Sequence, residues 1–300
     1  MSQTELVFIG HTCFDEVIPY GGQAELRPGS AVLCGAMAAA RIGKQVSVIT
    51  RMNPADVEIL EPLKALGIDV TVIPTPETTY MFVDHPTPDV DVRIIIQKHC
   101  AGFFDAEDIP PLNGSTVHLA GVSDQEFTVE FLERMRGRGL NLSVDMQNFV
   151  RRVNPESGEV TFEDVAEKER IVSLVNKVKL DVVEAEILTG TRDLEAAARQ
   201  FESWGAPETV ITHADGVLAR VDGQTYYEAF SNRNVSGRTG RGDTTFAGYL
   251  ARRMDHDVPD ALRFAAALVS IKMETPGPFA GDLDAVLDRM ASRHGAVQEG

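Results

Sequence analysis

The sequence predicts an α/β fold, a three-layer, doubly wound and mostly parallel sheet that carries a small β-sheet lid. Short apolar runs alternate along the chain with longer patterns of helical periodicity, as in folds with helices on both faces of a sheet. The runs ending at Thr50 and Thr212 are β-branched and apolar on both faces, which is typical of strands covered on both sides. The chain has 300 residues, 43% of them hydrophobic, so we expect one domain over residues 1–300.

Six apolar runs are predicted to be strands of the main sheet, and seven stretches between them are predicted to be helices. The strands are expected at 6–9, 46–50, 116–119, 140–145, 180–183 and 209–212. The helices are expected near 31–42, 56–66, 125–136, 163–176, 192–203, 243–253 and 259–273. Residues 12–29 and 74–105 break this alternation, because their strand-like segments have no crossover helices between them. We expect these two regions to build the lid.

The charge balance limits the partners. With 28 Lys and Arg against 45 Asp and Glu, the net charge is −17, which disfavours nucleic acid and anionic membranes as partners. The N-terminus shows no signal-peptide pattern, and Cys13, Cys34 and Cys100 form no disulfide or metal-binding spacing. We therefore expect a cytoplasmic protein, which must gather positive groups locally if it binds a polyanion.

Ionisable side chains follow several predicted strands at the points where those strands end. Asp145 ends one strand, Asp181 and Glu184 bracket the next, and His213 follows a third. In a doubly wound fold, ligands bind outside the carboxyl ends of the parallel strands. Three strand ends with such residues favour a site at this edge over coincidence.

The most informative segment is the glycine-rich turn within residues 237–248, which leads into a helical pattern. Converging backbone amides and a helix N-terminus suit an anion, and Asp243 falls in the first turn, where a carboxylate can accept a proton from a hydroxyl. Arg238 and Arg241 add positive charge. The alternative interpretation is an ordinary turn with Asp243 as a helix cap. The glycine spacing fits neither the Rossmann fingerprint nor the Walker A loop, which disfavours a nicotinamide-dependent oxidoreductase.

This segment resembles the D-T-T-G-A-G-D motif of the ribokinase-like (PfkB) carbohydrate kinases, a family that also includes nucleoside kinases. The resemblance covers nearly the whole chain and implies the ribokinase-like fold. It implies that Asp243 is the catalytic base, and that Gly240, Arg241 and Gly242 form the anion hole. Arg241 stands where the family has a small residue, and Gly237 stands where the motif has its first Asp.

A second motif resembles the family's N-x-x-E sequence, here Asp181 to Glu184, with Asp in place of Asn. The resemblance implies ATP and Mg²⁺ as cofactors, with Glu184 organising the magnesium shell. One carboxylate is chemically sufficient, because Mg²⁺ is usually held through waters and few carboxylates. The implied nucleotide-binding residues are Asp181, His213, Gly216, Arg238 and Gly277.

Two weaker motifs concern the phosphoryl acceptor. The segment from Gly29 to Cys34 is similar to the family's G-G-x-x-x-N, and the segment from Asp145 to Arg151 is similar to the D-x-Q-G-F-x-R of a subgroup with inositol-kinase-like members. Cys34 replaces an Asn, and a thiol is a poor hydrogen-bond donor, which weakens ribose as the acceptor. The implied substrate-binding residues are Asp15, Gly29, Ser30, Cys34, Gln147 and Arg151.

The predicted activity is ATP-dependent phosphoryl transfer to a hydroxyl of a small sugar or cyclitol. One alternative is a nucleoside kinase, for which aromatic residues near the lid would hold the base. These residues are Tyr80, Phe82, Phe103 and Phe104. The other alternative is a relative that binds ligand without turnover. Exposed lid strands also make a homodimer through the lid possible.

Overall fold

A nine-stranded sheet forms the centre of the computed structural model, which describes residues 4–89, 92–112 and 115–295. Its strands, in spatial order, are β15 (Gln224–Ala229), β14 (Gly216–Val221), β13 (Glu208–Thr212), β12 (Lys177–Asp181), β9 (Asn141–Asp145), β8 (Thr116–Leu119), β1 (Leu6–Ile9), β4 (Val46–Met52) and β5 (Asp69–Pro74). Every pair from β13 to β5 is parallel, and only β14 and β15 run antiparallel to their neighbours. The predicted mostly parallel sheet is confirmed.

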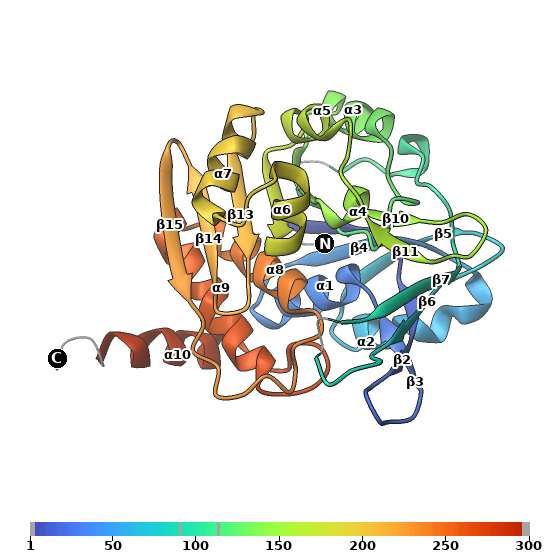
Figure 1. The fold of residues 1–300 in the computed structure, drawn as a ribbon, viewed down its shortest axis with the longest axis horizontal. Helices are drawn as coiled ribbons and strands as arrows, with labels where there is room; N and C mark the ends of the chain where they lie inside the picture. The colour runs from blue at the N-terminus through green and yellow to red at the C-terminus, as the bar shows by residue number, and fades with distance from the viewer. Residues whose placement is uncertain (1–3, 90–91, 113–114, 296–300) are drawn as a thin grey trace.

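Helices cover both faces of this sheet (Figure 1). One layer contains α1 (Ala31–Arg41), α2 (Glu61–Lys64), α8 (Arg241–Arg253), α9 (Val258–Met273) and α10 (Leu283–Gly295), and the other contains α3 (Val129–Gly137), α5 (Lys168–Ser173), α6 (Val182–Thr189) and α7 (Leu194–Ser203). The central strand β1 serves both layers, since Leu6 and Phe8 join one hydrophobic core while Val7 and Ile9 join the other. This alternation explains why the strand is apolar on both faces.

A separate four-stranded sheet lies within the two regions predicted for the lid. Its order is β3 (Glu25–Gly29), β2 (Cys13–Ile18), β6 (Thr79–Asp84) and β7 (Ile94–His99). One face of this small sheet packs on the β10 (Arg151–Val153) and β11 (Val160–Phe162) hairpin, through a cluster that includes Met81, Ile95 and Val160. The hairpin follows the short helix α4 (Gln147–Val150) at the carboxyl end of β9. The small sheet is thereby held beside the edge where the sequence places the site.

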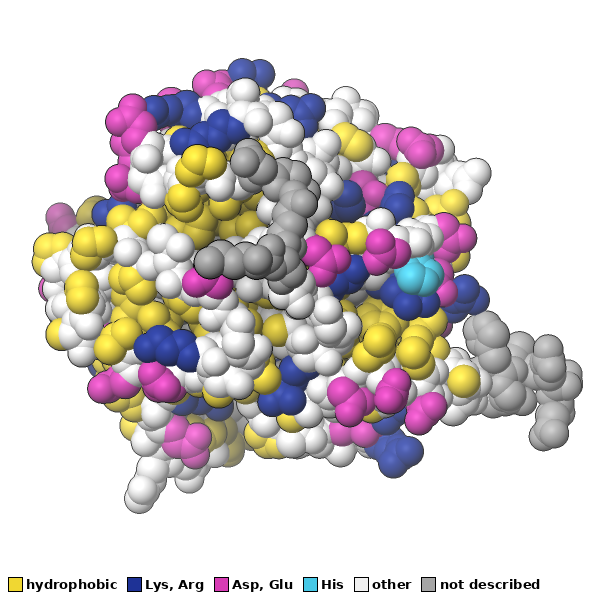
Figure 2. Space-filling view, turned by 180° about the vertical axis from the view of Figure 1, so that it is seen from behind, with side chains coloured by type: hydrophobic (Ala, Val, Ile, Leu, Met, Phe, Trp, Pro, Cys, Tyr) yellow, Lys and Arg dark blue, Asp and Glu magenta, His cyan; other side chains and the backbone are white. Residues whose placement is uncertain are grey.

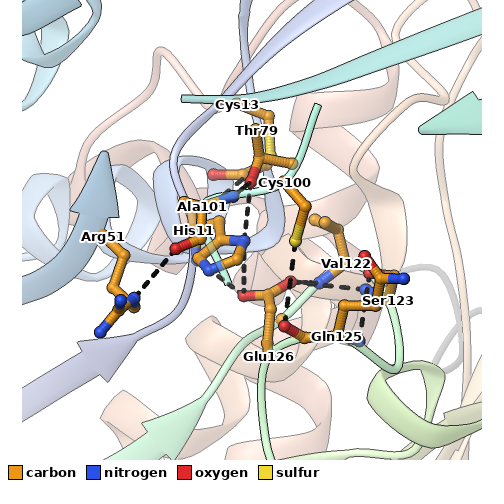
Figure 3. A network of polar contacts seen from close by, with 12 residues as sticks. His11, Cys13, Arg51, Thr79, Cys100, Ala101, Val122, Ser123, Gln125 and Glu126 are labelled. Atoms are coloured by element: carbon orange, nitrogen blue, oxygen red, sulfur yellow. Dashed lines mark hydrogen bonds and ion pairs between the residues drawn. The ribbon is translucent and has the colours of Figure 1, made fainter. Parts of the chain in front are cut away.

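A buried polar network ties the small sheet to the main body (Figure 3). His11, between β1 and β2, contacts Thr79 Oγ1 through Nδ1 at 2.8 Å and the Gly102 carbonyl through Nε2 at 2.9 Å. Its backbone N–H donates to Glu126 Oε2 at 2.7 Å, and the other oxygen of Glu126 accepts from the Val122 N–H at 2.5 Å. Burial lowers the pKa of His11, so the ring is neutral at pH 7. We call this set of five residues the root network.

Three predicted elements differ from the structure for local reasons. The strand predicted at 180–183 ends at Asp181, because the Asp181 carboxylate accepts from the Val183 and Glu184 amides and starts α6 at Val182. The helix predicted near 56–66 is instead a 3₁₀ segment, η1 (Pro54–Leu60), followed by the single turn α2. The helix predicted at 125–136 begins later, at Val129, where Thr128 caps it.

The surface is mixed in charge. On the face shown in Figure 2, acidic and basic side chains are interspersed, with apolar side chains between them. Among the helices that the structure describes, none is both long and apolar enough to cross a membrane.

Candidate active site

The glycine turn before α8 has the geometry that the sequence predicts. Gly240 adopts a left-handed conformation (φ 76°), which favours glycine, and Asp243 lies in the first turn of α8. A Cβ atom added to Gly240 would lie 2.7 Å from Cys34 Sγ, and one added to Gly242 would lie 3.0 Å from Lys179 Nζ. Both glycines are therefore enclosed by side chains, at a helix N-terminus that suits an anion.

Lys179 lies beneath this turn and forms a buried ion pair. It projects from β12, and its Nζ is 2.7 Å from Asp145 Oδ2, with both side chains almost fully buried. Burial alone lowers the pKa of the Lys179 ammonium, but the nearby carboxylates, Asp145 first, raise it above its usual range. The charge is thus fixed at this position.

A second buried lysine holds the segment before the turn. Lys272, in the last turn of α9, donates from Nζ to the backbone carbonyls of Gly237 and Thr239. Its ammonium also interacts electrostatically with Cys34 and Asp243. The two lysines therefore supply, on two sides of the turn, positive charge in a chain whose net charge is −17.

Asp243 lies close enough to the small sheet to act on Asp15 electrostatically. Burial raises the pKa of Asp15, on β2, to about 6; Arg27 and Arg151 oppose this rise, and Asp243 adds to it. Burial also raises the pKa of the Cys34 thiol to about 12, again with a contribution from Asp243. Asp15 and Cys34 therefore lie near the Asp243 carboxylate, Arg27 and Arg151 lie near Asp15, and Cys34 remains a neutral thiol.

The other predicted acceptor residues make mostly structural contacts. Gly29 lies against the Asp15 carboxylate with no room for a Cβ atom, and Ser30 caps α1 with an unusual positive φ of 132°. Gln147 donates from its side-chain amide to the Gly121 carbonyl at 2.6 Å. Arg151 lies over the Phe162 ring, and its Nε atom has no hydrogen-bond partner.

Glu184 is the predicted metal residue, and it is fully buried. Its Oε2 accepts from the Asp181 N–H at 2.8 Å, which completes a capping box, while Oε1 has no hydrogen-bond partner. Burial raises the pKa of Glu184 to about 8, with Asp181 adding to the rise. The unpartnered oxygen fits a hydrated cation. Within the described residues there is no cluster of three or more ligating side chains, so the site does not resemble an all-protein metal cage.

The predicted nucleotide residues other than Asp181 lie in or next to three loops, between β13 and β14, between β15 and α8, and after α9. His213 stacks on Tyr227 with ring centroids 5.6 Å apart, and its Nε2 has no hydrogen-bond partner. Burial lowers the pKa of His213, and Arg241 lowers it further. Gly216 begins β14, and a Cβ atom there would lie 2.5 Å from the Tyr227 hydroxyl. Arg238 belongs to the segment before Gly240, and Gly277 lies in the loop after α9.

Sequence reasoning missed three residues at this site: Lys179, Lys272 and Arg27. Lys179 and Lys272 each interrupt an apolar pattern that is otherwise buried, and a lysine is seldom fully buried without a partner. Arg27 lies directly opposite Asp15 in the β2–β3 register, which becomes visible only once the strands are paired.

Comparisons with known proteins identify the class of this protein, a kinase, and its family. The model of the pfkB family carbohydrate kinases matches residues 3–284. The chain belongs to this family and is a ribokinase-like kinase.

Several relatives are similar over almost the full chain. A curated cytidine kinase of Thermococcus kodakarensis is 27% identical over 256 residues, covering 82% of this chain and 87% of the relative. A pyrophosphate-dependent kinase in the ribokinase family, solved with a pyrophosphate analog and myo-inositol, is 30% identical, with a TM-score of 0.86 over 94% of this chain and 99% of the other. A sulfate complex of a pyrophosphate-dependent kinase is 32% identical, with a TM-score of 0.87 and the same coverage. Arabidopsis thaliana ribokinase with ribose and ATP shares the fold at 16% identity, with a TM-score of 0.76 over 96% of this chain and 99% of that one.

Proposed function

We propose that this kinase transfers a phosphoryl group from a phosphoanhydride donor to a hydroxyl of a small sugar or cyclitol. Asp243 accepts the hydroxyl proton as the acceptor oxygen attacks, and the amides at Gly240 and Gly242 hold the negative charge of the transferring group. The observation that carries this proposal is the position of Asp243, in the first turn of α8 after the glycine turn and close enough to Asp15 on the small sheet to raise its pKa.

Two further groups act on the donor. Lys179, beneath Gly242, adds charge to the anion hole from within the fold. Glu184 is the residue that would hold Mg²⁺, through water and its unpartnered Oε1. A bound Mg²⁺ neutralises charge on the donor phosphates.

For the donor, the observations favour inorganic pyrophosphate over ATP. Pyrophosphate is compact and carries no base or sugar to be recognised, and cationic side chains gather around the glycine turn in this acidic chain. These include Lys179, Lys272 and Arg241, with His213 beside Arg241. The two solved kinases at 30% and 32% identity are described as pyrophosphate-dependent. ATP, which the sequence predicts, is the second candidate, because ATP and ADP are bound in solved members of the same fold.

For the acceptor, the pairing of the small sheet favours a polyol over a nucleoside. Asp15 lies opposite Met81 in register, whereas Phe14 and Glu16 lie opposite Tyr80 and Phe82. Because side chains alternate between the faces of a sheet, Tyr80 and Phe82 point away from the face that carries Asp15. The Tyr80 hydroxyl donates to Glu16, which agrees with this orientation.

The remaining two aromatic residues also offer no base slot beside Asp243. Phe104 is buried against Phe127 and His11, and Phe103 is half exposed on the surface. Polar groups, namely Asp15, Arg27 and Arg151, face the acceptor space, which suits hydroxyl recognition. Cytidine remains the second acceptor candidate, because the curated relative is a cytidine kinase.

The test is a matrix of donors and acceptors with purified protein, read by ³¹P NMR for new phosphate monoesters. The donors are pyrophosphate and ATP, and the acceptors are myo-inositol, ribose, fructose and cytidine. The expected product is an inositol phosphate formed from pyrophosphate. Transfer from ATP but not from pyrophosphate would reject pyrophosphate as the donor. A product with cytidine but with no polyol would reject the polyol acceptor. No product with any pair would favour a ligand-binding protein without turnover.

The predicted homodimer is part of the proposal and is tested by native mass measurement. The edge strands of the small sheet are β3 and β7, and each carries an exposed apolar side chain, Leu26 and Ile94. The outer edge of β7 is partly covered, because Ile96 bridges Glu159 and the Gln97 N–H donates to the Gly158 carbonyl, so β3 is the edge that favours pairing with a second chain. A monomer at assay concentration would reject the dimer without affecting the proposed chemistry.

A further inference from the structure

Lys272 is buried in an unusual way for a lysine. Only 2% of its surface is exposed, and its ammonium donates to two backbone carbonyls, those of Gly237 and Thr239. Burial lowers its pKa, and Asp243 is among the acidic groups that oppose this. A buried lysine costs several kcal/mol unless its charge is compensated. Two carbonyls alone do not need a charged donor, so the charge itself requires an explanation.

The two carbonyls belong to the segment that leads into the glycine turn. Thr239 directly precedes Gly240, and Gly237 is held against the end of α9 by its own N–H, which donates to the Met273 carbonyl at 2.8 Å. Gly237 also packs so closely on the Thr275 and Lys272 carbonyls that no Cβ atom would fit. The Lys272 ammonium therefore lies between α9 and the catalytic turn and joins them.

The Lys272 ammonium occupies a position that would also suit a small monovalent cation. Backbone carbonyl oxygens replace the hydration shell of K⁺ in proteins, and an ammonium group has the same charge and a similar size. Here the cation is covalently part of the chain and lies close enough to Asp243 and Cys34 to affect their electrostatics. Its two hydrogen bonds order the segment that leads into the turn.

We propose that Lys272 is a positioning residue that acts as a tethered cation beneath the catalytic turn, so that turnover needs no alkali cation. This inference rests on the proposed function, in which the turn is the site of phosphoryl transfer. It predicts that removing the ammonium leaves two carbonyls and a vacancy that K⁺ or NH₄⁺ fills from solution.

The experiment compares Lys272→Met with the matched control Lys44→Met, which removes a surface ammonium paired with Asp255. Rates are measured at constant ionic strength in tetramethylammonium, Na⁺, K⁺ and NH₄⁺ chlorides. Wild type and Lys44→Met are expected to vary less than about two-fold among the salts. Lys272→Met is expected to lose roughly 100-fold in kcat in tetramethylammonium, the size of effect seen when one group that stabilises the transferring charge is removed. K⁺ or NH₄⁺ should raise the kcat of Lys272→Met by at least roughly ten-fold over its value in tetramethylammonium, and the increase should saturate with salt concentration.

A second readout does not depend on activity. The melting temperature of Lys272→Met, and of Lys272→Gln, should rise with K⁺ concentration, whereas that of wild type and Lys44→Met should not. If wild type shows no transfer with any substrate pair, the proposed function fails, and these melting curves still test the tethered cation. The inference is overturned if wild type requires K⁺ for turnover, or if Lys272→Met keeps the wild-type kcat in tetramethylammonium. It is also overturned if the melting temperatures of Lys272→Met and Lys272→Gln do not rise with K⁺. Failure of both variants to fold in K⁺ counts as this last outcome.

Discussion

The root network and the cluster around the glycine turn are both buried and polar, yet they differ in how fully their groups are paired. In the root network, both ring nitrogens of His11 and both carboxylate oxygens of Glu126 have partners. Around the turn, several buried polar atoms of the described residues have none. They include Glu184 Oε1, Thr212 Oγ1, His213 Nε2 and Thr244 Oγ1.

This difference separates a structural site from a functional one. Leaving a buried polar group unpaired costs about 1–3 kcal/mol, and a bound donor with its cation would complete the unpaired groups around the turn. The root network stabilises the attachment of the small sheet, whereas the turn cluster is arranged for donor phosphates and a cation. Variants in the two regions should therefore separate stability from activity.

Around Asp243, the largest effect is expected from Lys179→Met. The change removes charge beneath Gly242 and leaves the Asp145 carboxylate buried and unpaired, which should cost about 3–5 kcal/mol of unfolding free energy and roughly 100-fold in turnover. Urea unfolding and initial rates measure the two losses. The double variant Lys179→Met with Asp145→Leu should recover stability but not turnover. Recovery of both would mean that the ion pair only supports the fold.

In the root network, Glu126→Gln is expected to act mainly on stability. A neutral amide offers one acceptor where the carboxylate offers two, so at least one of the amides of His11 and Val122 loses its partner. The expected loss is about 1–3 kcal/mol in urea unfolding, with kcat changed far less. Glu130→Gln, at an exposed position on α3, is the control and should leave both unchanged. A loss of turnover without a loss of stability in Glu126→Gln would contradict the contrast between the two regions.

The free energy of unfolding should fall as the pH rises from the ordinary pKa of a glutamate to the raised pKa of Glu184. Its pKa is about 8 in the folded chain, against an ordinary value of 4.5, so between these values the folded chain binds a proton that the unfolded chain has lost. The unfolding free energy should therefore decrease from pH 5 to pH 8. Melting temperatures across this range give the slope, which should be shallower in Glu184→Gln. An equal slope in the two proteins would show that Glu184 is not the titrating group.

The smallest effect is expected at Ser30, whose φ of 132° is strained for a residue with a side chain. Ser30→Gly should stabilise the chain by about 0.5–1 kcal/mol, since glycine adopts this conformation freely and replaces a serine cap at little cost. Asp222→Gly is the control, because Asp222 has a common left-handed φ of 49° and should gain less. Thermal unfolding measures both, and destabilisation by Ser30→Gly would indicate that its side chain matters more than its strain.

The sequence predicts the parallel strands of the main sheet better than the hairpin that follows β13 and the helices α6 and α10. The predicted strands at 6–9 and 116–119 coincide with β1 and β8, because continuous apolar runs identify strands buried on both faces. The β14–β15 hairpin was missed, although its Asp222–Gly223 turn is a typical hairpin sequence. α6 and α10 were also not among the predicted helices.

The site was predictable where it follows a local motif. Asp243 and Gly240 stand in one short segment, so their geometry could be expected from the order of the residues. Lys179 pairs with a residue 34 positions away, and Arg27 approaches Asp15 only through strand register. Contacts of this kind depend on tertiary packing, which a single sequence does not show.

The central claim is that the Asp243 carboxylate takes the proton of the acceptor hydroxyl. The most direct measurement is single-turnover phosphoryl transfer by Asp243→Asn, together with the donor dissociation constant from calorimetry. The account predicts a rate lower by roughly 10²–10⁴-fold, with donor binding changed no more than a few-fold and the melting temperature preserved. A variant that transfers phosphate at close to the wild-type rate would contradict it.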